Sequence, residues 1–229
     1  MPQSLVELLP RLTLSPMENL IASLAIYALP VIFAITLHEA AHGYVARHFG
    51  DPTAWQMGRV SLNPLRHIDP IGTVLVPALL LATSGMLFGW AKPVPVNFSK
   101  LRRPKQDMLW VAAAGPASNL VMALGWAALF KFSAPTEFAS GQVLLSKMAA
   151  AGIEINTILM LLNLLPIPPL DGGRIAVSLL PHNLAWKFAR LEPYGFVILL
   201  ALLFTHVLDK ILGPLRYGFI SILRIIFDI

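Results

Sequence analysis

The chain has 229 residues, of which 56% are hydrophobic and 13% are charged, and its formal net charge at pH 7 is +5. The charged share is about half that of a soluble domain, and the mean hydropathy of +0.70 indicates a membrane protein. Because the sequence contains no cysteine, disulfides and thiolate metal sites are excluded. Basic residues are scattered between apolar segments, which is typical of cytoplasmic loops and argues against a nucleic-acid partner.

The first predicted helix covers residues 17–49 and contains an uncharged run from Leu20 to Leu37. At 1.5 Å per residue it measures about 50 Å, so one end should emerge from the bilayer. Pro30 should kink this helix, because proline cannot donate a backbone hydrogen bond. Gly50-Asp51-Pro52 should end it.

His38, Glu39 and His42 form the pattern H-E-x-x-H at the end of this uncharged run. Residues four apart share one helix face, so the two histidines can bind one metal ion. Glu39 lies about 100° further round and can reach a water molecule on that metal. The pattern could arise by chance, but two histidines and a glutamate are costly to bury in lipid unless they have a role. The sequence therefore predicts a zinc hydrolase site inside a membrane.

The remaining apolar segments predict further helices, with polar stretches at 51–71 and 89–105 between them. These segments are residues 73–88, 108–132, 147–165, 194–208 and 211–229, the last of which could lie along the membrane interface. We expect an all-α polytopic membrane protein with a single membrane-embedded domain over residues 1–229. Its catalytic core of three helices should span about 18–180, with re-entrant or strand-like loops, and C-terminal helices should follow at about 183–229.

A third metal ligand should come from another His, Asp or Glu at the same depth, and Asp171 is the best candidate. Prolines before it and glycines after it break the helix, so its carboxylate can turn toward a neighbouring helix. The alternative is that Asp171 caps the short helix after it. Glu154 and Glu192 are weaker candidates, and His67 could support the site without binding the metal.

Three motifs in this order resemble those of the site-2 proteases, a family of intramembrane zinc metallopeptidases. HEAAH at 38–42, GPASN at 115–119 and NLLPIPPLDGGR at 163–174 match the family patterns H-E-x-x-H, G-P-x-x-N/S and N-x-x-P-x-P-x-L-D-G. The resemblance covers residues 18–180. The chain lacks a PDZ-like or CBS-like domain and resembles the short prokaryotic group, which carries the stretch FGWAKPVPVN.

The resemblance implies one zinc ion per chain, bound by His38, His42 and Asp171, with Glu39 as general base. It also implies that Asn163 binds the backbone of the substrate, which would be the transmembrane segment of another protein. A transmembrane helix has no free amides, so it must unwind locally before cleavage. The irregular stretches 51–71 and 89–105 could then hold the extended peptide by strand addition.

Two other functions remain open from the sequence. A membrane transporter for divalent metals could also carry H-E-x-x-H, but it needs more spans and a second helix rich in His and Asp. The second alternative is a membrane metalloprotease whose third ligand is a glutamate. The sequence does not indicate an oligomeric state.

The membrane topology follows from the position of the metal ligands. Residues 108–132 and 147–165 cross the membrane twice, so Asp171 lies on the side where the first helix ends only if 73–88 does not cross. That segment is short for a span, and the loops on both sides of it are basic. We therefore expect 73–88 to be re-entrant or interfacial, with the active site toward the cytoplasm of a prokaryotic plasma membrane. The alternative is a short true crossing by 73–88, with the zinc near the middle of the bilayer.

Overall fold

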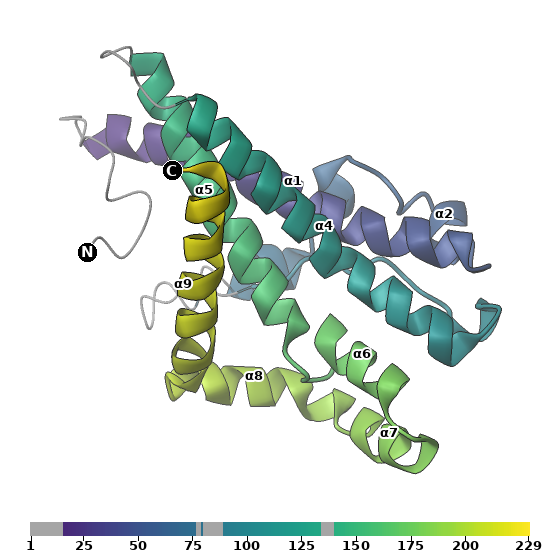
Figure 1. Cartoon of the computed structure of the whole chain (residues 1–229). Helices are drawn as coiled ribbons and strands as arrows, with labels where there is room; N and C mark the ends of the chain where they lie inside the picture. The colour runs from purple at the N-terminus through teal and green to yellow at the C-terminus, as the bar shows by residue number, and fades with distance from the viewer. Residues whose placement is uncertain (1–15, 77–78, 80–88, 134–139) are drawn as a thin grey trace.

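The computed structural model describes residues 16–76, 79, 89–133 and 140–229, and its regular elements within these ranges are all helical. Three long helices form the centre of the molecule: α1 (Pro16–His48), α4 (Pro104–Phe132) and α5 (Ser140–Leu164). Figure 1 shows α4 and α5 side by side, with α1 crossing behind them. The predicted all-α architecture is confirmed.

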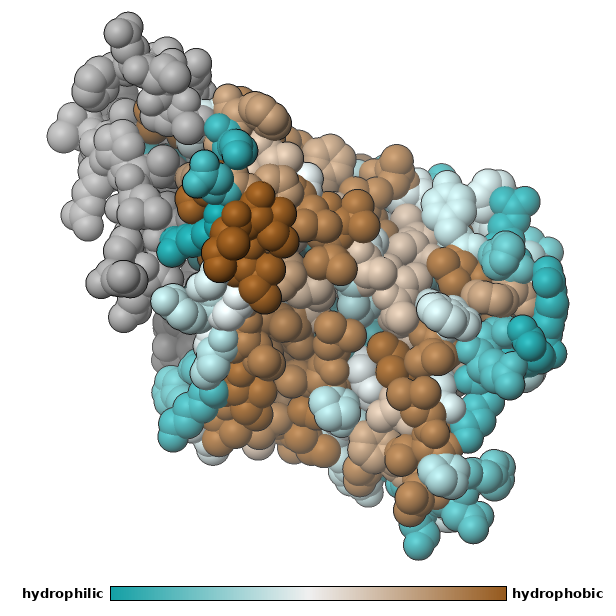
Figure 2. All heavy atoms as spheres, in the orientation of Figure 1, coloured by the Kyte–Doolittle hydropathy of each residue, from teal (hydrophilic) through white to brown (hydrophobic). Residues whose placement is uncertain are grey.

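The apolar composition of these helices supports membrane insertion. Three of them contain stretches long and apolar enough to cross a membrane, namely Ala25–His48, Pro104–Phe132 and Val143–Leu164. On the face drawn in Figure 2, hydrophobic residues cover the middle of the bundle, and hydrophilic residues gather at the end where α1 stops and α4 starts. This banded surface is what a polytopic membrane protein needs.

Helix α1 ends where the sequence predicts. Gly50 follows it with a φ of +108°, a left-handed conformation that residues with a side chain rarely adopt. The N–H of Asp51 then donates to the carbonyl of Ala46 at 2.9 Å, which closes the end of the helix. The chain therefore leaves the polar end of α1 in a defined direction, next to the segment that leads into α4.

Small residues allow α4 and α5 to pack closely. Ala123 and Ala127 of α4 are fully buried together with Ala150 of α5. Gly152 of α5 lies so close to the ring of Trp126 that a side chain at this position would overlap it. Helices in lipid associate through such close packing, because burial from water contributes little between them.

The C-terminal region contains a helix at each of the two predicted apolar segments, 194–208 and 211–229, and a further short helix before them. After α6 (Asp171–Leu179), the chain forms α7 (His182–Ala189), the turn η5 (Glu192–Tyr194), α8 (Gly195–Phe204) and α9 (Val207–Phe227). Helix α8 has only 10 residues, about 15 Å, and is too short to span the hydrocarbon layer. The break lies at His206, whose φ of 56° is left-handed, and the helical segments before and after it meet at 80°.

Helix α9 packs against the bundle and is not an isolated interfacial helix. Its buried residues Ile220 and Leu223 join the core formed by α4 and α5. Arg216 pairs with Glu154 of α5 at 2.9 Å, so each charge is neutralised where the helices meet. This pairing explains how α9 can place Arg216 against an apolar bundle.

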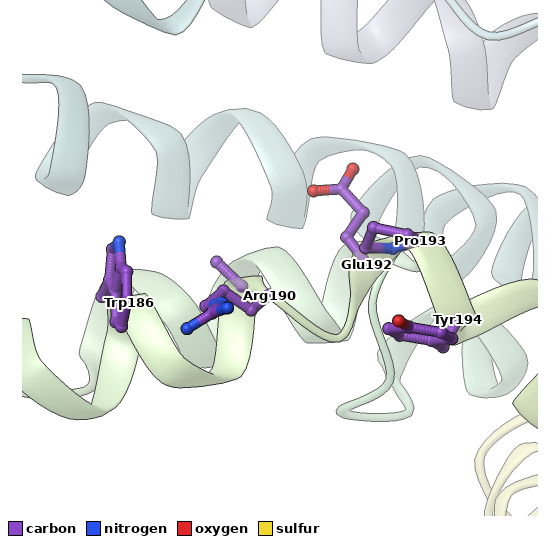
Figure 3. A pocket seen from close by; sticks show the side chains of 6 residues that line it. Trp186, Arg190, Glu192, Pro193 and Tyr194 are labelled. Atoms are coloured by element: carbon purple, nitrogen blue, oxygen red, sulfur yellow. The ribbon is translucent and has the colours of Figure 1, made fainter.

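Helix α7 and the turn η5 carry an aromatic and basic surface. Arg190 lies over the ring of Trp186 at 4.7 Å, and Tyr194 follows one turn later. Figure 3 shows Glu192 pointing away from Tyr194, on the other side of the turn. Tryptophan, tyrosine and arginine gathered in this way are typical of a membrane–water interface.

The two loop stretches contact each other directly. The N–H of Trp90 donates to the carbonyl of Gly72 at 3.0 Å, and the N–H of Lys92 donates to that of His67 at 2.9 Å. Most of the predicted re-entrant segment 73–88 lies outside the described residues. The hydrogen bond between Gly72 and Trp90 brings together the residues that flank this segment.

The prediction of strand-like loops is wrong for residues 51–71. This stretch contains α2 (Thr53–Gln56) and the 3-10 turn η2 (Pro64–Arg66), followed by η3 (Pro70–Leu75). Residues 89–97 are neither helix nor strand. Asn63 and Asp69 cap the turns through their side chains, and such local bonds compete with strand pairing.

Candidate metal centre

Helices α1 and α6 bring the three predicted metal ligands together. The Nε2 atoms of His38 and His42 are 3.1 Å apart, and Asp171 Oδ2 lies 3.1 Å from the first and 3.3 Å from the second. All three side chains are buried. The donor atoms of a tetrahedral zinc centre lie about 3.3 Å apart, so this triangle has the dimensions that zinc requires.

The hydrogen bonds of the two imidazole rings determine which nitrogen faces the centre. His38 Nδ1 donates to Asn119 Oδ1 at 2.6 Å, and His42 Nδ1 donates to the carbonyl of Val111 at 2.7 Å. In the neutral imidazoles both protons are therefore on Nδ1, and both Nε2 atoms present lone pairs. Asp171 Oδ2, which is buried and has no hydrogen-bond partner, is the third acceptor. Because these three atoms are all acceptors and face one point, a cation bound between them would satisfy all three.

Asn119 is oriented by α1 and α5 as well as by its own helix, α4. Its Nδ2 donates to the carbonyl of Ala34 at 3.2 Å and to Asn156 Oδ1 at 3.0 Å. Asn156 Nδ2 in turn donates to the carbonyl of Gly152 at 2.8 Å. Both amides are fully buried, so this relay leaves the oxygen of Asn119 directed at His38.

Gly115 allows α4 to approach the metal ligands. A Cβ atom at this position would overlap Nε2 of both His38 and His42. Gly115 and Asn119 are four residues apart and therefore lie on the same face of α4, toward α1. The first of them makes room for the imidazole rings and the second orients one of them.

The sequence around Asp171 places it at the start of α6. A Cβ at Gly172 would overlap the carbonyl oxygens of Leu164 and Leu165, so glycine lets the first turn of α6 lie against the end of α5. The N-cap position of α6 is occupied by Leu170, and Asp171 is the first residue of the helix itself. In the structure Asp171 faces the histidines, and the capping interpretation is not supported.

Glu39 lies beside the centre, on a face of α1 different from that of the histidines. It is half-buried, and its Oε2 accepts a hydrogen bond from the backbone N–H of Val94 at 2.7 Å. Within the described part of the chain, no protein group bonds its other oxygen, Oε1. The carboxylate is therefore held on one side and free on the other.

The other candidate residues lie outside the cluster of three. Asn163 donates from Nδ2 to the carbonyl of Leu159 in its own helix at 3.0 Å and makes no hydrogen bond to the metal ligands. Glu154 pairs with Arg216, so it is not free to serve as the third ligand. Glu192 lies on the turn η5, and His67 Nε2 donates to the carbonyl of Ser61. Their positions leave Asp171 as the acidic member of the centre.

The sequence interpretation assigned no role to several residues that support the centre. GPASN includes Gly115 and Asn119, and a polar residue four positions after a glycine in an apolar span was the available signal. Nothing marked Asn156, because its contact with Asn119 joins positions 37 apart in the sequence. The hydrogen bond from Val94 to Glu39 is made by the backbone N–H, so the type of residue at position 94 does not indicate it.

Comparison with known proteins gives several relatives. The chain is 41% identical over 202 residues to the protein named "Putative zinc metalloprotease YwhC" from Bacillus subtilis (strain 168). The aligned region covers 85% of this chain and 88% of the relative. It is 33% identical over 193 residues to "Putative zinc metalloprotease Rip2" of Mycolicibacterium smegmatis, covering 82% of this chain and 70% of that protein.

The chain belongs to the site-2 protease family. The protein is therefore a zinc metalloprotease, and zinc is the metal that the His-His-Asp cluster fits. A Rip2 protein of Mycobacterium tuberculosis is also similar, with 29% identity over 186 residues. No family model and no solved structure matches the chain.

The contact between Gly115 and the histidines predicts a specific defect. Gly115→Ala should lower zinc affinity at least about 10-fold, because the new methyl group displaces the imidazoles from the centre. The measurement is zinc release to a competing chelator from purified protein. Gly125→Ala is the matched control on the same helix, since a Cβ there meets nothing within 4 Å. Equal zinc affinity in the two variants would contradict the close approach of α4.

Proposed function

We propose that this protein hydrolyses peptide bonds in or near the transmembrane helices of other membrane proteins. In this proposal His38, His42 and Asp171 bind one zinc ion, and Glu39 is the general base. The observation that carries the proposal is the position of a buried three-acceptor cluster beside a half-free carboxylate, inside an apolar helical bundle.

Zinc, when bound, supplies a Lewis acid that makes water acidic enough to react near neutral pH. Glu39 Oε1, which has no protein partner among the described groups, accepts the proton of the attacking water. The oxygen of that water forms a bond to the carbonyl carbon of the substrate peptide. Glu39 then returns the proton to the leaving nitrogen as the C–N bond breaks, so the carboxylate ends in its starting state.

The remaining residues act on the histidines and on the substrate. Asn119 and the carbonyl of Val111 hold both imidazoles in the tautomer that leaves Nε2 free for the metal. We assign binding of the substrate backbone to Asn163, which lies in the last turn of α5, eight residues before Asp171. In the structure its Nδ2 is bonded within α5, so its Oδ1 is the atom available to an unwound peptide N–H.

The alternatives from the sequence lose their support. A glutamate as third ligand required Glu154 or Glu192, and Asp171 faces the histidines instead of either. A metal transporter needed a second site on another helix. Within the described residues, the cluster of three is the one group of His, Asp and Glu side chains that could hold a metal ion.

The assignment of Glu39 predicts a separation of metal binding from catalysis. Glu39→Gln should keep its zinc, because Glu39 is not a ligand, and should lose cleavage by about 10²- to 10⁴-fold. The measurement compares zinc content by atomic absorption with membrane-protein fragments identified by mass spectrometry in cells. Glu192→Gln, which neutralises an exposed glutamate, is the control and should cleave normally. Normal cleavage by Glu39→Gln would refute its role as base.

We also propose that the active site faces the cytoplasm of a prokaryotic plasma membrane. The bonds between the two basic loop stretches support a common side for them, and Arg59 adds another by donating to the carbonyl of Lys92 at 3.0 Å. Positively charged loops are retained in the cytoplasm. The connection between α4 and α5 would then lie outside.

Single cysteines test this topology, because the chain has none of its own. Ser61→Cys and Ser99→Cys should be protected from a membrane-impermeant thiol reagent in intact cells, whereas Ser140→Cys should react. Permeabilised cells provide the control, in which all three should be labelled. Labelling of Ser99→Cys from outside, with Ser61→Cys protected, would mean that 73–88 crosses the membrane.

A further inference from the structure

The segment 91–97, with the sequence AKPVPVN, crosses the face of α1 that carries Glu39. We call this segment the strap. Its contact with the site is the hydrogen bond of 2.7 Å from the N–H of Val94 to Glu39 Oε2, which joins residues 55 apart in the sequence. Nothing in the proposed chemistry requires this bond, so its purpose needs a separate explanation.

The sequence of the strap isolates this one donor. Pro93 and Pro95 have no backbone N–H, so Val94 supplies the only one between them. Proline also fixes its own φ and restricts the residue before it to an extended backbone. Val94 is therefore held in a stiff segment, and its N–H loses little further freedom on bonding Glu39.

The strap is attached to the protein at both ends. At its start, the N–H of Lys92 bonds the carbonyl of His67 at 2.9 Å, and Arg59 donates to the carbonyls of Lys92 and Pro93. At its end, the N–H of Asn97 bonds Asp51 Oδ2 at 2.6 Å. Asp51 follows α1 directly, so the strap is fixed relative to the helix that carries Glu39.

The same attachments argue against strand addition at the other edge of the strap. In an extended chain, successive residues direct their N–H groups to opposite sides. Within residues 92–95, the N–H groups of Lys92 and Val94 are both bonded to the protein, and Pro93 and Pro95 have no N–H to offer a substrate. The strap therefore suits contact with its own protein better than pairing with a substrate.

Gly43 provides the space in which the strap lies. It is four residues after Glu39 and therefore on the same face of α1. A Cβ at Gly43 would lie 3.2 Å from Val94 Cγ1 and 2.5 Å from Val60 Cγ2. Val94 is itself buried, which keeps water away from its bond to the carboxylate.

From these contacts we propose that Val94 is a positioning residue whose backbone N–H orients Glu39 for proton transfer. The bond holds Oε2, so that Oε1 is presented to the attacking water. Glu39 is then pre-aligned, and its carboxylate does not have to be ordered during the reaction. This inference rests on the proposed role of Glu39 as base.

The test removes the N–H and leaves the side chain in place. An ester at position 94, made by incorporating the α-hydroxy analogue of valine, should lower kcat on the order of 10- to 100-fold, as expected for a misaligned catalytic group. KM for a fluorogenic membrane-spanning peptide and the zinc content should stay at the wild-type values. The same ester at Val96 is the control, because its N–H has no partner among the described groups.

Two genetically encoded variants support the ester experiment. Val94→Pro also removes the N–H, and Val94→Ala keeps it, so Val94→Ala should retain a larger share of kcat. An unchanged kcat in the Val94 ester would overturn the inference, and an increase would mean that the strap obstructs the site. Glu39→Gln measured alongside separates the role of Glu39 from that of Val94. Cleavage by Glu39→Gln would refute the proposal that Glu39 is the base. An inactive Glu39→Gln together with a fully active Val94 ester would refute only the positioning role of Val94.

Discussion

Everything in this structure depends on three buried acceptor atoms that face one point inside an apolar bundle. Two imidazole nitrogens and one carboxylate oxygen within 3.3 Å of one another repel unless a cation lies among them. The surrounding protein enforces this arrangement instead of relieving it. Asn119 and the carbonyl of Val111 occupy the other side of each imidazole, and Gly115 removes the side chain that would separate the rings.

Helix α1 serves two purposes through its different faces. The face with His38 and His42 meets α4 and α6, where Asp171 joins the two histidines and α4 orients their rings. The face with Glu39 and Gly43 meets the strap, where the carboxylate is held by a backbone donor. Because the two sets of contacts come from separate parts of the chain, we expect that mutations can change metal binding and the position of the Glu39 carboxylate independently.

The sequence predicted the parts of this molecule that have a local signal. Long apolar runs marked α1, α4 and α5, and a break of prolines and glycines marked Asp171 as a carboxylate that could turn toward a neighbouring helix. The missed features are non-local or depend on the backbone alone. The buried hydrogen bond between Asn119 and Asn156 joins two helices, and the hydrogen bond from Val94 involves no side-chain donor. The break between α8 and α9 depends on the left-handed backbone of His206, a residue type that does not indicate such a break in the sequence.

The central claim is that Asp171 completes a zinc centre, and X-ray absorption at the zinc edge tests it directly. The wild-type protein should hold about one zinc per chain with two imidazole ligands and one carboxylate. Asp171→Asn, which preserves size, should lose most of its zinc on dialysis against a weak chelator while keeping its helical content by circular dichroism. Full zinc occupancy with an unchanged absorption spectrum in Asp171→Asn would contradict the account.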